Sequence, residues 1–98
     1  MPQSLSQLIV HTVFSTKGRA AIIQSERRSE LYAFMAGVLK TTGCRPIMIN
    51  GVADHVHLLF ALPATLTLAD ALRTLKAKSS AWIRTRDRPF SWQAGSPA

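Results

Sequence analysis

Two histidines one residue apart, His55 and His57, stand in the run Asp54-His-Val-His-Leu-Leu-Phe60. In a β-strand, residues two apart point to the same side, so both imidazoles would project from one face and the apolar residues between them from the other. Two neutral imidazoles at this spacing can bind one metal ion when a third ligand comes from elsewhere. The alternative is a pair of partly exposed histidines with ordinary hydrogen-bond partners, because a His-x-His motif by itself is not specific.

Basic and hydroxyl side chains form a second candidate set, suited to gripping the phosphates of a nucleic acid. They fall in an early loop and along a later helix: Lys17, Arg19, Arg73, Lys76, Lys78, Ser79 and Ser80. An ordinary solvated helix face is the alternative for Lys76 and Lys78. His11, on an earlier apolar segment, is a further candidate for the histidine face, against the alternative of a structural role.

The charge balance also points to a polyanionic partner. The 98 residues include twelve Lys and Arg against five Asp and Glu, a formal net charge of +7. This excess favours nucleic acid ahead of a membrane surface, and a solvated basic surface is the alternative. The single Cys44 cannot form an intramolecular disulfide, and no apolar run reaches the roughly 20 residues that span a bilayer. The first residues do not resemble a signal peptide, so a cytoplasmic protein is expected.

Three strands are needed to position these side chains. Segments 8–14, 45–52 and 55–62 are rich in apolar and β-branched residues, as strands are. Asn50-Gly51 has the composition of a tight turn, which predicts a reversal between the second and third strands. Pro63 is expected to end the third. The alternation in the first strand puts His11 on the face opposite Phe14.

Two amphipathic segments, 25–42 and 67–84, predict helices. Ser25 is the expected N-cap of the first, and Gly43 its C-terminal stop. Thr67, three residues before an aspartate, resembles a capping box for the second. The predicted buried stripes are Leu31, Phe34, Met35, Val38 and Leu39 on the first helix, and Leu68, Leu72, Leu75, Ser79 and Trp82 on the second.

The order is strand, helix, strand, strand, helix, and a segment from Pro89 to Gln93 that could begin a fourth strand. This β-α-β-β-α-β order predicts an α+β fold, a ferredoxin-like, RRM-like antiparallel sheet with both helices on one face. A chain of 98 residues is expected to form one domain. If the helices cover the Val56 side, the imidazoles of His55 and His57 stand on the open face of the sheet.

These pieces together resemble the single-tyrosine transposases of small bacterial insertion sequences and their REP-associated relatives, within the His-hydrophobe-His (HUH) nuclease class. The pieces occur in family order across nearly the whole chain. They are His11-Thr-Val-Phe-Ser-Thr-Lys17, Asp54-His-Val-His-Leu-Leu-Phe60 with Pro63, Leu75-Lys-Ala-Lys-Ser-Ser80 with Trp82, and Phe90-Ser-Trp-Gln-Ala-Gly95.

The resemblance implies a bacterial homodimer that binds single-stranded or hairpin DNA for transposition. His55 and His57 would hold Mg²⁺ or Mn²⁺ and so polarise the scissile phosphate. A tyrosine would attack that phosphate, giving a 5′-phosphotyrosine and a free 3′ hydroxyl. In the family, this tyrosine lies on a helix after the region matching Phe90–Gly95, usually with a third metal ligand such as Gln.

The one tyrosine of the printed sequence is Tyr32, on the first helix, where packing explains it. We therefore expect a domain that lacks the tyrosine helix and does not cleave DNA alone, or a binding module of the same fold without catalysis. A histidine-triad nucleotide hydrolase would need another histidine where Leu59 stands. An RNA-recognition module would present aromatic residues on the open face, where His55 and His57 are expected.

Overall fold

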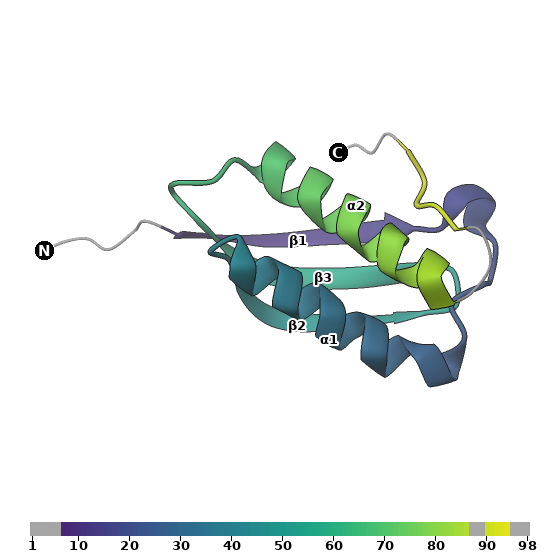
Figure 1. Cartoon of the computed structure of the whole chain (residues 1–98). Helices are drawn as coiled ribbons and strands as arrows, with labels where there is room; N and C mark the ends of the chain where they lie inside the picture. The colour runs from purple at the N-terminus through teal and green to yellow at the C-terminus, as the bar shows by residue number, and fades with distance from the viewer. Residues whose placement is uncertain (1–6, 87–89, 95–98) are drawn as a thin grey trace, which may run out of the picture.

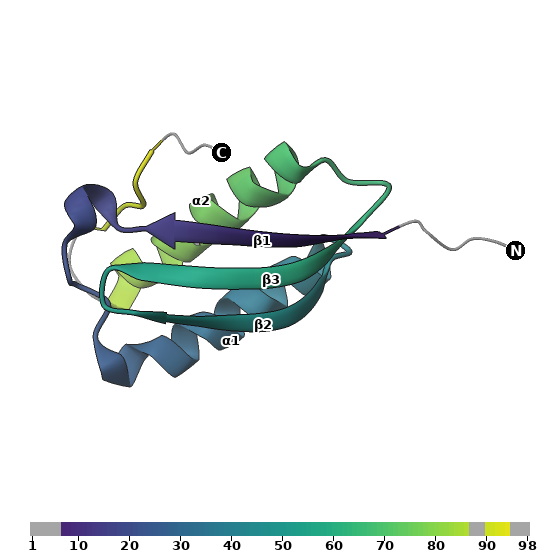
Figure 2. The ribbon, with the colours of Figure 1, turned by 180° about the vertical axis from the view of Figure 1, so that it is seen from behind.

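The computed structural model describes residues 7–86 and 90–94, in which two helices pack on one face of a three-stranded antiparallel sheet (Figure 1). The strands are β1 (Gln7–Ser15), β2 (Arg45–Val52) and β3 (His55–Pro63), in the spatial order β1-β3-β2. The helices are α1 (Ser25–Thr41) and α2 (Leu68–Arg86), and a short 3₁₀ turn, η1, spans Lys17–Arg19. Seen from behind, the other face of the sheet is covered by no helix of these described residues (Figure 2). The predicted α+β class and the placement of both helices on one face are confirmed.

The central strand β3 separates the core from the open face. Its residues Val56, Leu58 and Phe60 are fully buried and face the helices. They belong to one apolar cluster with Leu31 and Met35 of α1, among others. Because successive side chains of a strand alternate, burying this set fixes the intervening residues of β3 on the face without helices.

The reversal between β2 and β3 differs from the prediction. Asn50 and Gly51 lie inside β2, opposite His57 and Val56, and the chain turns at residues 53–54. A Cβ added to Gly51 would come within 2.8 Å of Val56 Cα and would also meet the His55 carbonyl oxygen. The glycine therefore permits a close approach of two strands and does not supply a turn.

The first helix largely follows the predicted pattern. Leu31, Met35, Val38 and Leu39 are buried, and Gly43 after the helix has a left-handed φ of 95°. The predicted cap is wrong, because Ser25 is the first helical residue and the preceding Gln24 makes no side-chain cap hydrogen bond.

In α2, the cap is confirmed and the buried stripe is shifted. Thr67 Oγ1 accepts a 3.1 Å hydrogen bond from the Asp70 amide. Leu68, predicted to be buried, is 41% exposed. The buried residues lie mainly four apart, as one helical face requires; they are Ala71, Leu75, Ser79, Ser80 and Ile83. Neither helix of the described residues is long and apolar enough to cross a membrane.

The predicted fourth strand is reduced, within the described residues, to one antiparallel bridge between Trp92 and Thr16. Pro89 lies outside the described residues. Phe90 and Trp92 are buried, and the Trp92 ring packs edge-on against Phe14 of β1 at 5.4 Å between centroids. The segment therefore follows the end of β1, where it runs beside η1 (Figure 1). A ferredoxin-like sheet has its fourth strand at this edge.

Candidate functional site

Three histidines gather on the open face of the sheet. The His55 and His57 rings stand edge to face with centroids 5.0 Å apart, as the alternation in β3 predicts. His11 of β1 stacks on His57 with centroids 5.6 Å apart, and its Nε2 lies 3.4 Å from His57 Nδ1. The antiparallel register explains this meeting, because Val13 pairs with His57, and His11 lies two residues before Val13 on the same face, opposite Leu59.

Asp54 anchors the first histidine of the pair. Its Oδ1 lies 2.7 Å from His55 Nδ1, and its Oδ2 lies 3.4 Å from Arg19 Nε. The hydrogen bond from His55 is the largest influence and lowers the pKa of the Asp54 carboxyl; desolvation opposes it, and the nearby charge of Arg19 lowers the pKa further. Asp54 is absent from the predicted site residues, although its position directly before His55 is a signal that points to it.

The loop that carries Lys17 and Arg19 is fixed beside Asp54 by backbone contacts. The buried Thr16 donates its amide to the Asp54 carbonyl at 2.9 Å and its hydroxyl to the Ala20 carbonyl at 2.7 Å. Gly18 and Arg19 both have left-handed φ values, 67° and 58°. These contacts hold the exposed Lys17 and Arg19 at the His55 end of the sheet.

The segment that contains Ser91 and Gln93 contacts the same loop through hydrogen bonds to Lys17 and Gly18. The Lys17 amide donates to the Ser91 carbonyl at 3.0 Å, and the Gly18 amide donates to Gln93 Oε1 at 3.0 Å. The sequence pattern does not predict this contact, since the two segments are more than 70 residues apart.

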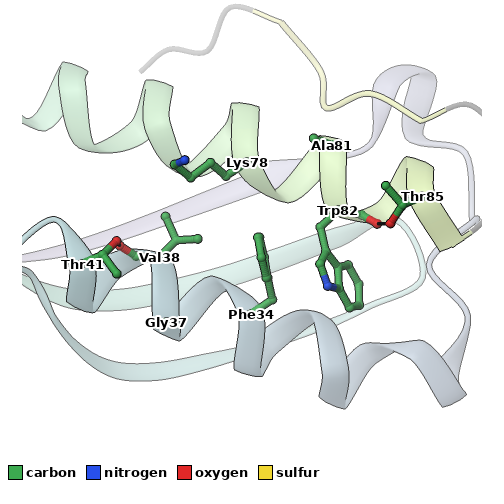
Figure 3. A pocket seen from close by; sticks show the side chains of 8 residues that line it. All are labelled: Phe34, Gly37, Val38, Thr41, Lys78, Ala81, Trp82 and Thr85. Atoms are coloured by element: carbon green, nitrogen blue, oxygen red, sulfur yellow. Dashed lines mark hydrogen bonds between the residues drawn. The ribbon is translucent and has the colours of Figure 1, made fainter.

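The basic residues of α2 belong to the other layer of the molecule. Lys76 donates to the Gln93 carbonyl at 3.3 Å and lies over the Phe14 ring, while Arg73 pairs with Asp70 one turn earlier. Lys78 lines an apolar groove of about 650 Å³ between α1 and α2 (Figure 3). Arg73 and Lys78 therefore lie on the helix layer, whereas Lys76 lines, together with His11, a hollow at the edge of β1.

The two serines of α2 are inside the molecule. Ser79 is fully buried, donates its hydroxyl to the Leu75 carbonyl at 2.6 Å and accepts a hydrogen bond from Trp92. Ser80 is 9% exposed and donates to the Ala77 carbonyl at 3.2 Å. Their hydroxyls are engaged within the fold, so the structure offers little support for direct phosphate contacts from either serine.

Comparisons with known proteins agree with the fold and with the family that the sequence resembles. A family model described as "Transposase IS200 like" matches residues 4–95. The chain belongs to the IS200-like transposase family. A crystal structure of a protein from Deinococcus radiodurans R1, assigned as a transposase, superposes with a TM-score of 0.80 at 16% identity, over 98% of this chain and 85% of that chain. At this identity the structural match supports the fold alone. A search of curated proteins found no match to the sequence.

The histidine pair of this IS200-like transposase could supply two ligands to a divalent ion whose other coordination positions are filled by other groups. Among the described residues, no group of three or more His, Cys, Asp and Glu is arranged to hold a metal ion. His55 and His57 nevertheless present two neighbouring imidazoles on an open face. The Asp54 carboxylate can only accept a hydrogen bond, so His55 Nδ1 donates it and Nε2 keeps its lone pair for a ligand.

The one tyrosine of this transposase sequence is placed away from the histidines. Tyr32 is on α1, in the helix layer, beside a hollow that Pro46 and Met48 of β2 also line. Its hydroxyl is buried without a hydrogen-bond partner among the described residues. Burial raises the pKa of Tyr32 above its ordinary value, which disfavours the phenolate. This setting fits the packing role that the sequence predicts for Tyr32.

Proposed function

We propose that this transposase binds Mg²⁺ or Mn²⁺ through His55 and His57 and presents the ion to a phosphate of single-stranded or hairpin DNA. The observation that carries the proposal is the pair of imidazoles 5.0 Å apart on the face of the sheet without helices. A divalent ion there would polarise a phosphate and stabilise the charge that develops on it during transfer. The residues of the chain would hold that ion and guide the DNA backbone.

The charge distribution supports DNA as the partner. The chain has a formal net charge of +7, and Lys17 and Arg19 are exposed on a loop that contacts the histidine site through Asp54. We infer that this loop binds the phosphates next to the one at the metal site. Arg73 and Lys78 of α2 would contact a more distant part of a hairpin. A homodimer acting in the cytoplasm is expected from the family resemblance.

We also propose that the 98-residue chain does not cleave DNA by itself. Covalent cleavage needs a tyrosine hydroxyl within reach of the phosphate. The Tyr32 hydroxyl is buried in the helix layer, whereas His55 and His57 are on the opposite face of the sheet. This separation supports the alternative function as well, a DNA-binding module that acts without catalysis.

Calorimetric titration with Mn²⁺ tests the metal site. Wild-type protein should bind one ion weakly, because two imidazoles leave most coordination positions to water. His55→Ala and His57→Ala should each abolish the heat of binding. Asn50→Ala is a matched control, since Asn50 pairs with His57 across the sheet and is exposed. Equal binding by wild type and His57→Ala would exclude the proposed site.

Incubation with labelled hairpin DNA and Mn²⁺, followed by a denaturing gel, tests the absence of cleavage. No covalent protein–DNA band is expected from the wild-type chain. A band that Tyr32→Phe abolishes would make Tyr32 the nucleophile and overturn this part of the proposal. A family helix bearing a tyrosine, appended after Gly95, should produce a band if the site supports catalysis and should produce none if the chain is a binding module.

A further inference from the structure

We propose that Asp54 is a positioning residue that fixes the metal-binding atom of His55, and that Arg19 holds the Asp54 carboxylate in place for this task. The inference deepens the proposed function and rests on the proposed metal site. Its basis is the chain of contacts from Arg19 Nε to Asp54 Oδ2 at 3.4 Å and from Asp54 Oδ1 to His55 Nδ1 at 2.7 Å.

The contact between Asp54 and His55 decides which ring nitrogen of His55 is free to bind a metal ion. A neutral imidazole has one N–H and one lone pair, and either nitrogen can carry the proton. Because a carboxylate offers only acceptors, its contact with Nδ1 requires the proton to be there. Nε2 is then the atom with a lone pair, and the hydrogen bond also fixes the rotation of the ring. Without Asp54, both tautomers and several ring orientations would be populated.

The contact between Arg19 and Asp54 limits the movement of the Asp54 carboxylate. Asp54 lies at the β2–β3 reversal, where a side chain would otherwise turn freely. Arg19 reaches it from the loop after β1, and Thr16 of the same loop donates its amide to the Asp54 carbonyl at 2.9 Å. Side chain and backbone of Asp54 are thus both held by one loop, which also carries Lys17.

The arrangement joins two parts of the proposed site. Arg19 is a candidate phosphate contact and is 61% exposed, so its guanidinium has donors available beyond the one that faces Asp54. A DNA backbone bound to Arg19 would therefore contact the residue that, through Asp54, orients the metal ligand His55. The partly exposed ion pair itself is expected to contribute little to folding, which leaves orientation of the carboxylate as its main effect.

The test combines Asp54→Ala and Asp54→Asn with two measurements. Long-range ¹H–¹⁵N spectra of the metal-free protein at about pH 8, where an ordinary histidine is neutral, report the tautomer of each ring. Titration with Mn²⁺ alone reports affinity. Wild-type His55 should show the Nδ1–H tautomer, which Asp54→Ala should convert into a mixture. Asp54→Asn replaces one carboxylate oxygen with an NH2 donor, so it no longer requires a proton on Nδ1 and should weaken the preference for this tautomer.

The Mn²⁺ affinity of Asp54→Ala should fall about ten- to a hundredfold, the usual effect of removing an outer-shell partner. Arg19→Ala should lower it by a smaller factor. Asp70→Ala is the matched control, because Asp70 is an exposed carboxylate that also pairs with an arginine, at the start of α2. It removes the same charge and should leave both readouts unchanged.

Two outcomes would overturn the inference. One is an Nε2–H tautomer of His55 in the wild type, and the other is an Asp54→Ala affinity equal to that of Asp70→Ala. Absence of Mn²⁺ binding by the wild type would instead contradict the proposed function, together with the metal part of this inference. The tautomer in metal-free protein would still show whether Asp54 orients His55, so the two failures are distinguishable.

Discussion

The indole N–H of Trp92 donates a 2.9 Å hydrogen bond to the Ser79 hydroxyl, and both groups are buried. The same hydroxyl donates to the Leu75 carbonyl, so Ser79 connects α2 to the segment that follows it. That segment continues to Gln93, whose side chain accepts from the Gly18 amide in the loop beside the histidines. A residue in the helix layer thereby helps to fix a loop at the edge of the open face.

Ser79→Ala should destabilise the fold by about 1–3 kcal/mol, because it leaves the buried Trp92 N–H without its acceptor. Ser80→Ala is the control, since the Ser80 hydroxyl bonds only to the Ala77 carbonyl of its own helix among the described contacts. Urea unfolding measures both. Equal losses in the free energy of unfolding for the two variants would show that the contact between Ser79 and Trp92 does not stabilise the fold.

Gly51→Ala should destabilise the protein strongly, since its Cβ would collide with the backbone of β3 near His55 and Val56. Gly37→Ala gives the opposite expectation, because Gly37 is helical and a Cβ there meets no atom within 4 Å. It should raise stability by about 0.5–1 kcal/mol, the usual advantage of alanine within a helix. Thermal unfolding of both variants is the measurement, and a stable Gly51→Ala protein would contradict the close approach.

Lys17→Ala should lower the salt dependence of hairpin-DNA binding if the proposed function holds. A phosphate contact contributes about one unit to the slope of log affinity against log salt, and its loss should reduce the slope by about that amount. Lys78→Ala removes the same charge from the groove between the helices and should reduce the slope less. Fluorescence anisotropy over a series of salt concentrations tests this, and a larger effect of Lys78 would place the DNA on the helix layer.

Asp70 should make stability dependent on pH in the acid range. Hydrogen bonds from Arg73 and Thr67 lower the pKa of its carboxyl in the folded state below the ordinary 3.8. Its contribution is therefore fully present above the unfolded pKa and is lost as the pH falls through the lower folded value. Compared with wild type, Asp70→Asn should be less stable at about pH 7, and this difference in urea unfolding should shrink as the pH is lowered through the acid range. A difference that persists at the lower pH would contradict this linkage.

The sequence predicts the histidine face well because it depends on short-range alternation. Burial of Val56, Leu58 and Phe60 forces His55 and His57 outward, whatever the partners of the strand are. The approach of His11 to His57 depends on the register between β1 and β3, which a single sequence does not reveal. The role of Asp54 depends on a side-chain contact with the loop after β1, which is equally non-local.

Several sequence patterns suit more than one structural environment. Asn-Gly is common in turns, yet Gly51 is needed where two strands approach closely. Serines on a basic helix suggest an exposed phosphate-binding surface, yet Ser79 satisfies its hydroxyl inside the fold. Helical spacing shows that Lys76 shares a face with its neighbours along α2, but it does not show that Lys76 reaches the Phe14 ring of β1 and the Gln93 carbonyl.

The two-residue alternation of β3 has a consequence for how such a chain can change in length. One residue inserted between Ala53 and Leu59 would move every following side chain to the other face, sending apolar residues to solvent and polar ones into the core. Residues 64–65, which are exposed between β3 and α2, carry no such constraint. Insertions and deletions among relatives should therefore collect in that connection, while the histidine strand changes by substitution alone.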